Sequence, residues 1–361
     1  MSDPNLPIDA QRAADELVHA GAPGAAARVD DESGVRQAAS GVADLRTGRP
    51  MQPDLHFRVG SATKSFVAAL VPRLVSEGTV SLSDTVDRWL PSILPYSDRV
   101  AIRQLLNHTA GVPQYTDIVW QELYASAQAR FRTWSPRELV ALVAGRPADF
   151  PPGSAWSYSN TGYILLGLIV EEATGARLDR ELARRIFGPL ELRHTSFPIG
   201  ALELPSPASR GYTPPLGPEP EVVDGPLEDF TDQGPSYTWA AGAAVSNLEN
   251  LTRFFRVLLN GGFLPPRLVA ELLTTVAVPH ASIPLPLLDR YGLGVAELDT
   301  PSGPLVGHAG GIPGFLSMTL STTDGRRQLA VMINVGDRAP ALLVDAYIRA
   351  FRELGTRLLS S

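Results

Sequence analysis

Patterns typical of β-hairpins lie near both ends of the chain, and this feature most constrains its fold. Near the start, short alternating segments at residues 25–29 and 35–43 flank Asp-Asp-Glu-Ser-Gly, which indicates a turn. Near the end, residues 315–321 and 328–335 flank Thr-Thr-Asp-Gly-Arg-Arg, and residues 305–307 suggest a further short edge strand. Strands from both termini therefore favour one antiparallel sheet with the middle of the chain inserted between them.

Helical patterns fill most of the remaining sequence. Residues 8–20 and 340–359 predict terminal helices, and further helical patterns occupy 102–107, 136–144, 161–174, 178–186 and 248–259. We predict an α+β fold with an antiparallel sheet flanked by the N- and C-terminal helices and an inserted mainly helical domain. The sheet domain comprises residues 8–75 and 236–361, and the helical domain comprises 76–235.

A proline-rich, acidic stretch interrupts this pattern at residues 201–236. It holds eight prolines and seven acidic residues but one arginine, which predicts an extended excursion.

Composition excludes several classes of function. The net charge of −7 is modest and spread along the 361 residues, so we expect no nucleic-acid partner. The absence of cysteine excludes thiol catalysis, and the six scattered histidines lack the spacing of zinc ligands, so we expect no metal and no cofactor. No run approaches the roughly 18 apolar residues of a membrane span. The first residues lack the basic and apolar regions of a signal peptide, which predicts a cytoplasmic protein.

The pair Ser61 and Lys64 is the first candidate for chemistry. A short strand at residues 55–59 ends at Gly60, and a helix is predicted from Ser61 to Glu77. Residues three apart share a helix face, so the hydroxyl and the amine can meet. Lys64 is the only lysine among 31 basic residues, and an amine can lose its proton where a guanidinium cannot. The alternative is a helix N-cap followed by a solvated lysine.

Two later motifs carry further polar groups. Tyr158 can act as a general acid or base, and the amide of Asn160 can hold a substrate carbonyl or the lysine. His308 can move a proton, and Gly310 and Gly311 behind it allow a substrate to approach and free a backbone N–H for an oxyanion. The alternatives are a helix cap at Asn160 and a glycine-rich turn beside a structural histidine.

Together these motifs resemble the class C β-lactamase and D-alanyl-D-alanine carboxypeptidase family of penicillin-recognising serine enzymes. The resemblance covers nearly the whole chain and implies a β-lactamase/transpeptidase-like fold. It rests on Phe57-Arg-Val-Gly-Ser-Ala-Thr-Lys-Ser-Phe66, Gln104-Leu-Leu-Asn-His-Thr-Ala-Gly111, Tyr158-Ser-Asn-Thr-Gly-Tyr163, Trp239-Ala-Ala-Gly242, Tyr291-Gly-Leu-Gly294 and the His308 motif.

The resemblance implies a serine hydrolase that works through an acyl-enzyme on Ser61. Lys64 and Tyr158 would share the proton transfers, the lysine cation lowering the pKa of the tyrosine, while Asn160 and His308 complete the site. The backbone N–H groups of Ser61 and Gly311 would form the oxyanion hole. The substrate-binding residues would include Ala309, Gly310 and Trp239, with a plain core aromatic as the alternative for the tryptophan.

The chain departs from the family where relatives bind a substrate carboxylate. Carboxypeptidases hold it with two hydroxyls and an arginine, but here these positions are Ala309, Gly311 and Ala296. Each lost charge-assisted bond costs roughly 1.5–3 kcal/mol. β-Lactamases usually have lysine where His308 stands. Only another arginine, such as Arg210 or Arg326, could replace these groups.

The departures favour a small-molecule or peptide substrate cleaved at an amide or ester, most plausibly one that contains a D-amino acid. The alternatives are an acyl transferase or thioesterase that releases or cyclises peptides, with a carrier-bound thioester as partner; a D-Ala-D-Ala carboxypeptidase or β-lactamase; and a non-catalytic binding or scaffold protein. An α/β-hydrolase is disfavoured because Gly-x-Ser-x-Gly does not occur in the chain.

Overall fold

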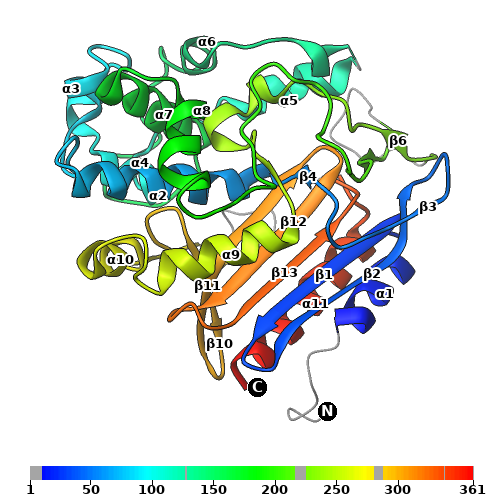
Figure 1. Ribbon diagram of the computed structural model, residues 1–361. Helices are drawn as coiled ribbons and strands as arrows, with labels where there is room; N and C mark the ends of the chain where they lie inside the picture. Colours follow the sequence, from blue (N-terminus) through cyan, green and yellow to red (C-terminus); the bar gives the residue numbers. More distant parts are fainter. Residues whose placement is uncertain (1–9, 127, 216–224, 280–287, 337, 361) are drawn as a thin grey trace.

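A large antiparallel sheet joins the two ends of the chain. The computed structural model describes residues 10–126, 128–215, 225–279, 288–336 and 338–360. Within these residues the sheet has nine strands in the order β3-β2-β1-β13-β12-β11-β10-β9-β8 (Figure 1). Its strands are β1 (Gly24–Asp31), β2 (Gly34–Asp44), β3 (Arg49–Pro50), β8 (Val276–Ala277), β9 (Arg290–Tyr291), β10 (Ala296–Thr300), β11 (Gly303–Ile312), β12 (Phe315–Thr322) and β13 (Gln328–Ile333). Strand β1 pairs with β13, with Ala25 opposite Ile333, so the predicted closure by both termini is confirmed.

The predicted edge strand at residues 305–307 is wrong in length and position. Strand β11 has ten residues and lies inside the sheet, between β12 and β10. Its second half is rich in glycine, which resembles a turn in the sequence.

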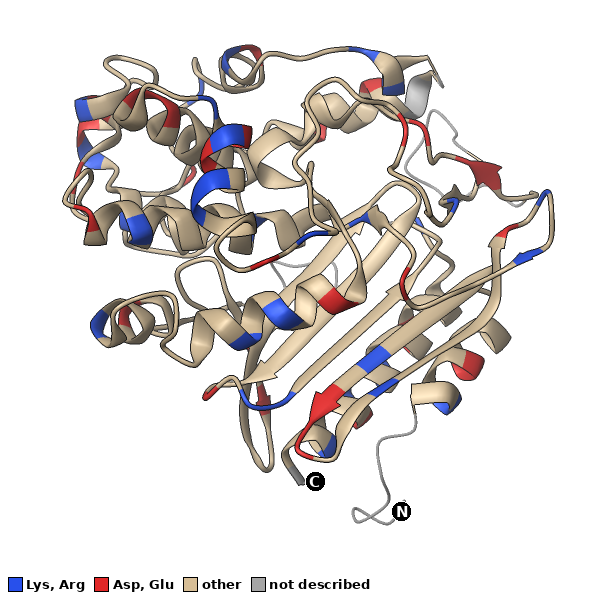
Figure 2. Cartoon of the chain, in the orientation of Figure 1, with Lys and Arg blue, Asp and Glu red and all other residues tan. Residues whose placement is uncertain are grey.

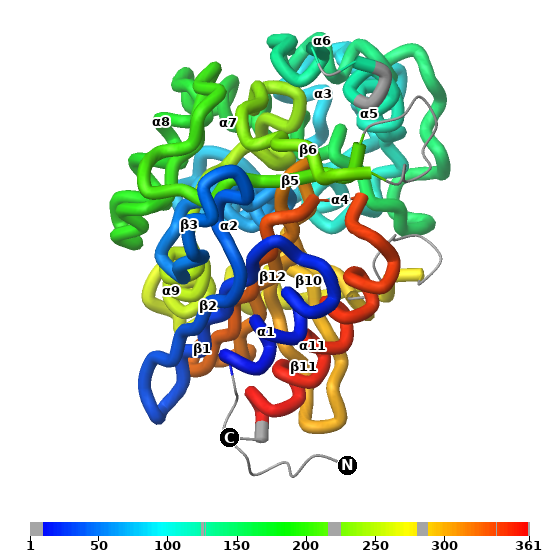
Figure 3. The backbone as a smooth tube through the Cα atoms, turned by 90° about the vertical axis from the view of Figure 1, so that its right-hand side faces the viewer, coloured from blue at the N-terminus to red at the C-terminus, as the bar shows by residue number. Residues whose placement is uncertain are grey.

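Helices cover both faces of the sheet. Helices α1 (Ala10–His19) and α11 (Ala341–Ser360) pack against each other on one face, as Figure 3 also shows. Helix α9 (Leu248–Leu259) lies on the other face against β13 and β12. Strand β13 is accordingly buried along its whole length. The predicted terminal helices are confirmed for the described residues, and residues 8 and 9 lie outside them.

The middle of the chain forms a cap of helices next to the sheet (Figure 1). Its centre is α7, which is buried from Thr161 to Val170 and ends at Gly175 with φ +66°. Helix α7 spans Asn160–Thr174, and the α-helices around it are α2 (Thr63–Ser76), α3 (Val86–Trp89), α4 (Ile102–Leu106), α5 (Thr116–Ala125), α6 (Pro136–Ala141), α8 (Leu178–Leu182) and, beyond the cap, α10 (Pro266–Leu272). The domain boundaries given above stay a prediction.

The excursion at residues 201–236 contains little regular structure, in agreement with its composition. Its described part forms only a pair of two-residue strands, β5 (Tyr212–Thr213) and β6 (Glu228–Asp229), and a short turn that begins at Pro235. Residues 216–224 lie outside the described residues. The excursion passes close to the strand that leads to Ser61: the backbone N–H of His56 donates to the carbonyl oxygen of Pro207 at 3.0 Å.

Charged residues of both signs are interspersed over the helices and loops, whereas the central strands carry few (Figure 2). Among the described residues, no helix is both long enough and apolar enough to cross a bilayer.

Candidate active site

A tight turn presents Ser61 at the start of α2. Strand β4 (Phe57–Arg58) pairs with β7 (Val245–Ser246) and leads into a 3₁₀ turn at Gly60–Ala62. Gly60 has φ +51°, a conformation that favours glycine. The regular α-helix begins at Thr63, two residues later than predicted, because the serine itself belongs to the turn.

Lys64 meets the serine inside the protein. Its side chain is fully buried, and its Nζ lies 3.0 Å from Ser61 Oγ and 2.7 Å from the carbonyl oxygen of Ala241. Burial lowers the pKa of the Lys64 amine well below its usual range, because a charged ammonium loses its hydration there. A neutral amine at this distance can accept the serine proton. The solvated-lysine alternative is therefore wrong.

Tyr158 lies on the other side of the same amine. The Lys64 Nζ is 4.9 Å from the centre of the Tyr158 ring, and a side-chain hydrogen bond joins Tyr158 to Ser61. Burial raises the pKa of Tyr158 above its usual value, and the bond to Ser61 opposes this only in part. The expected lowering of the tyrosine pKa by a lysine cation is therefore not found: burial raises the pKa of Tyr158, which favours a neutral phenol.

Asn160 follows Tyr158 by two residues but does not bond to the lysine. It is the first residue of α7, and the N-cap is Ser159, whose Oγ accepts a bond from the third residue of the helix. The backbone N–H of Asn160 donates to Gln114 Oε1 at 2.8 Å, and its amide lies 3.5 Å from Thr116 Oγ1. The predicted contact with Lys64 is not among these, because that amine bonds to Ser61 and to a backbone carbonyl.

His308, on β11, packs against the ring of Tyr291. Its Nε2 lies 2.8 Å from Tyr291 Oη, and its Nδ1 contacts the carbonyl oxygen of Ala309. Burial lowers the pKa of His308 to about 3, with repulsion from a charged Lys64 as a smaller cause. The ring is therefore neutral at working pH, and it can orient neighbours by hydrogen bonds but does not act as a cationic acid.

Glycines bring β11 against the nucleophile turn. A Cβ on Gly310 would lie 1.9 Å from the carbonyl oxygen of Val59, and one on Gly60 would lie 2.6 Å from that of Gly311. Gly310 is thus required by contact within the chain, rather than by the approach of a substrate as expected. At Gly311 the nearest atom to an added Cβ belongs to a leucine side chain at 3.3 Å, so this position is less crowded.

Strand β11 extends beyond the end of its neighbour β10 on the side next to Ser61. Strand β10 pairs with β11 only as far as Gly307, opposite Ala296. Alternate N–H groups of a strand point to opposite edges, so the N–H of Ala309 or Gly311 can face the side on which β10 has ended. This arrangement suits a backbone N–H that stabilises an oxyanion.

Trp239 belongs to the core rather than to a cleft wall. It is 6% exposed and packs against Gly167 of α7, where an added Cβ would lie 2.6 Å from the indole ring. The core alternative therefore describes this residue better. The same short turn still serves the site, because the carbonyl of Ala241 accepts the bond from Lys64.

Sequence reasoning missed a buried histidine beside the tyrosine. The ring of His108 lies 4.3 Å from that of Tyr158, and its Nδ1 accepts a bond from the backbone N–H of Ser159 at 3.1 Å. Tyr163 and Tyr291 pack against the same ring. The Asn-His-Thr-Ala-Gly motif contained the signal, but only the fold brings it to the site.

The two arginines that could replace the missing carboxylate-binding groups lie beside aspartates outside the site. Arg210 bonds to Asp229 at 2.7 Å and lies 3.4 Å from Asp232. Arg326 sits in the turn between β12 and β13, next to Asp324, at the end of the sheet away from Ser61.

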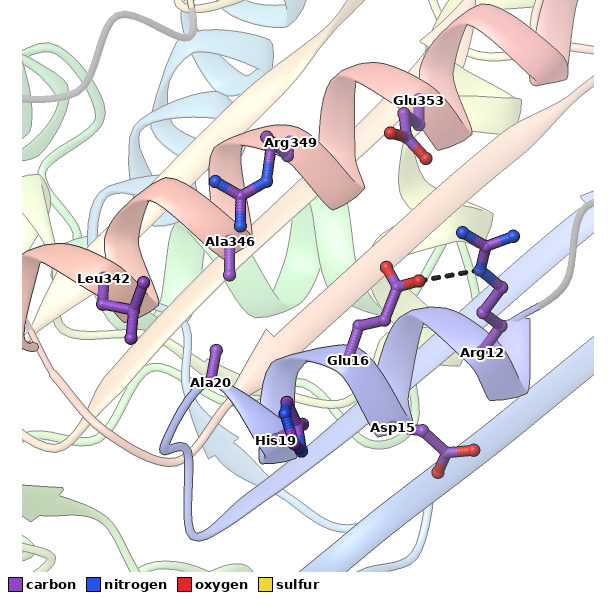
Figure 4. A pocket seen from close by; sticks show the side chains of 9 residues that line it. All are labelled: Arg12, Asp15, Glu16, His19, Ala20, Leu342, Ala346, Arg349 and Glu353. Carbon is purple, nitrogen blue, oxygen red and sulfur yellow. Dashed lines mark hydrogen bonds and ion pairs between the residues drawn. The ribbon is translucent and has the colours of Figure 1, made fainter. Parts of the chain in front are cut away.

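The described residues contain no group of three or more His, Asp or Glu side chains that could hold a metal ion. A pocket of about 830 Å³ lies between α1 and α11, on the face of the sheet opposite α9, and includes the Arg12–Glu16 ion pair (Figure 4). None of its lining residues belongs to the site.

Comparison with known sequences extends this picture. Residues 10–353 match the family model described as Beta-lactamase. Penicillin-binding protein 4* of Bacillus subtilis (strain 168) is 29% identical over 312 residues, which cover 81% of this chain and 64% of that protein. Esterase EstB of Burkholderia gladioli is 36% identical over 168 residues, 44% of this chain and 43% of the esterase. The chain therefore spans less than two thirds of the length of these two relatives.

Solved structures match over almost the full length. A D-stereospecific amidohydrolase from Streptomyces sp. has a TM-score of 0.83 and 33% identity, covering 93% of this chain and 96% of that one. A D-amino acid amidase from Ochrobactrum anthropi SV3, complexed with L-phenylalanine amide, has a TM-score of 0.83 and 29% identity, covering 97% and 96% of the two chains.

Proposed function

Because this chain belongs to the beta-lactamase family, we propose that it is a serine hydrolase in which Ser61 forms an acyl-enzyme with a small amide or ester substrate. The observation that carries the proposal is the fully buried Lys64 amine, 3.0 Å from Ser61 Oγ. A lysine with a lowered pKa is a base that can act near neutral pH.

In the acylation step the neutral Lys64 amine takes the proton of Ser61 as Oγ attacks the substrate carbonyl. The new C–O bond forms while the carbonyl electrons move to oxygen, and the N–H groups of Ser61 and Gly311 stabilise that oxyanion. Gly60 and Gly311 pack backbone to backbone, which supports this placement.

Tyr158 supplies the proton that the leaving group needs. As a neutral phenol bonded to Ser61, it can donate to the departing amine or alkoxide and recover a proton from the Lys64 ammonium. The bond between the acyl carbon and the leaving group then breaks. In the second step water attacks the acyl carbon while the same two residues remove its proton. The bond between the acyl carbon and Ser61 Oγ then breaks, Oγ receives that proton, and the carboxylic acid leaves.

The decisive experiment is mass spectrometry after reaction with a fluorophosphonate or a penicillin. We expect one adduct on Ser61, which Ser61→Ala abolishes, and much slower labelling in Tyr158→Phe. A folded protein that no reactive ester or phosphonate labels would support the non-catalytic alternative instead.

We propose that the acyl group or its leaving partner contains a D-amino acid, with an amide or ester rather than a free carboxylate at the cleaved end. Two solved structures at TM-score 0.83, a D-stereospecific amidohydrolase and a D-amino acid amidase, support this choice. So do Ala296 and Ala309, which offer no charge to a carboxylate, and the ion-paired Arg210.

A substrate panel tests the choice. A D-amino-acid amide, its L-enantiomer, a p-nitrophenyl ester, nitrocefin, an acyl thioester and an acyl-D-Ala-D-Ala peptide would be compared by kcat/KM. We expect the D-amide and the ester to be cleaved well above the carboxylate peptide. Efficient release of terminal D-Ala would overturn the substrate class while leaving the acyl-enzyme mechanism intact.

A further inference from the structure

Gln233, in the excursion at residues 201–236, is a fully buried amide beside the site. Its Nε2 donates to the carbonyl oxygens of Pro313, at 2.8 Å, and Phe230, at 2.9 Å. Its Oε1 accepts a bond from Tyr237 Oη. Pro313 follows Gly311 by two residues, so one of these bonds fixes the turn at the end of the proposed oxyanion strand.

The backbone of Gln233 also binds the strand that carries the nucleophile. Arg58 lies three residues before Ser61, is 1% exposed, and donates from Nη2 to the carbonyl oxygen of Gln233 at 3.0 Å. Its remaining bonds run to the carbonyls of Leu202 and Thr231 in the same excursion. Burial lowers the pKa of Arg58 to about 10, so the guanidinium stays charged at neutral pH. The bonds tie the nucleophile strand and the excursion together.

A third branch reaches the helix that carries Asn160. Tyr237, whose hydroxyl binds Gln233, accepts at its carbonyl a bond from Tyr115 Oη at 2.6 Å. The backbone N–H of Tyr115 donates to Thr161 Oγ1 at 3.1 Å, and Thr161 is the neighbour of Asn160 on α7. One buried set of hydrogen bonds thus connects the segments that carry all three motifs.

Such a set constrains position more than apolar packing does. Apolar side chains can slide with little loss, whereas displacing a buried polar group leaves a donor or acceptor without a partner. The amide of Gln233 suits this role, because two carbonyls face its NH₂ group and a hydroxyl faces its oxygen.

Building on the proposed function, we propose that Gln233 is a positioning residue for the oxyanion hole. It holds the turn after Gly311 at a fixed distance from the strand that ends at Ser61, so that the two N–H groups converge on one oxygen. The described part of the excursion around Gln233 therefore contributes to the geometry of the site.

The test compares Gln233→Met with Gln328→Met. Gln328 is also fully buried, and its Nε2 donates to Ser321 Oγ and to the Gly325 carbonyl, but it lies at the far end of β13. Five residues separate it from the end of β13 near the site, roughly 17 Å along a strand. Both variants lose a buried amide, so both should melt at lower temperature.

The first readout is the pre-steady-state rate of Ser61 acylation by a p-nitrophenyl ester. We expect Gln233→Met to slow acylation about tenfold with KM within about twofold, less than the 10²–10³-fold that follows loss of a whole oxyanion donor. Gln328→Met should stay within about twofold of the wild type, since the oxyanion donors are untouched. If Gln233→Met does not fold, Gln233→Asn, one methylene shorter, takes its place.

The second readout is the infrared stretch of the acyl-enzyme carbonyl, edited with ¹³C. Weaker hydrogen bonds from the oxyanion hole should move this band to higher wavenumber in the Gln233 variant only. Equal effects of the Gln233 and Gln328 variants, or slower acylation with an unmoved band, would overturn the positioning role. A wild-type chain that is not acylated on Ser61 would instead overturn the proposed function, and this role with it.

Discussion

Replacing Lys64 with methionine should change how the stability of the protein depends on pH. Methionine keeps most of the side-chain volume but cannot bind a proton. Wild-type Lys64 is fully buried, and its pKa in the folded state is lowered by that burial. In the unfolded chain the amine returns to a pKa of about 10.4.

The sign and the size follow from proton linkage. Between the lowered folded pKa and the unfolded pKa, the unfolded chain holds one proton more than the folded chain. The free energy of unfolding therefore rises with pH by about 1.4 kcal/mol per pH unit in this window. From pH 7 to 9 the wild type should gain about 2.7 kcal/mol relative to Lys64→Met when the folded pKa lies below 7. A folded pKa inside the window would show as the pH at which the gain begins.

Other buried groups leave this window clear. His308, with a folded pKa of about 3, affects stability below its unfolded value of about 6.5. The buried tyrosines, whose pKa values are raised, act above about pH 10. Both contributions are also common to the two proteins and cancel in their difference.

Urea unfolding of both proteins at pH 7, 8 and 9 measures the difference directly. The pH profile of acylation in the wild type supplies a second measurement, which should level off above the same pKa. Curves that stay parallel within about 0.5 kcal/mol over the window would refute the reasoning, because Lys64 would then keep its proton in the folded state.

Three further predictions concern β11 and its neighbours. In Gly310→Ala the added methyl meets a backbone oxygen at 1.9 Å, so we expect thermal melts to show a loss of about 1–3 kcal/mol in stability. In Gly311→Ala the methyl lies 3.3 Å from a leucine side chain, so the loss of stability should be smaller. Equal losses would contradict this account. The folded pKa of His308 is about 3, so its contribution to stability is lost as the pH falls from about 6.5 to 3, by up to about 1.4 kcal/mol per pH unit. His308→Gln should therefore reduce the pH dependence of the free energy of unfolding in urea over this range. An unchanged slope would argue against a neutral buried ring. His108→Asn keeps an acceptor for the Ser159 N–H and tolerates φ +63°. His108→Phe leaves that N–H without a partner, which costs about 1–3 kcal/mol. The rate of acylation should therefore fall further in the phenylalanine variant, and the opposite order would show that the ring contact with Tyr158 matters more.

The fold class could be predicted because strand and helix patterns are local. The first hairpin was placed within two residues, since alternation and a turn both lie within about 20 residues. Strand β11 was misjudged for a physical reason. Its Gly307, Gly310 and Gly311 are typical of turns, but in the folded chain the first two make room for backbones of β12 and of the nucleophile turn. Only the fold shows that requirement.

In the site, too, local contacts could be predicted from the sequence and long-range contacts could not. Ser61 and Lys64 are three residues apart, so their contact is local and could be predicted from spacing, even though Ser61 lies in the 3₁₀ turn before α2. The contact of His108 with Tyr158 joins loops 50 residues apart, and the bond between Gln233 and Pro313 spans 80 residues. No local pattern indicates such pairs. The sequence left Trp239 open between a cleft wall and the core, because burial of a large aromatic depends on what packs against it.

The pairing of β1 with β13 also determines how late during synthesis the sheet can be completed. During synthesis the chain must grow by about 270 residues after Ser61 before the last strand of the sheet exists. At about 5–20 residues per second this takes roughly 15 to 55 s. Until then β11 has no complete sheet to hold it against the nucleophile turn. Under the proposed mechanism, a nascent chain therefore contains Ser61 and Lys64 long before it has the complete sheet that acylation requires.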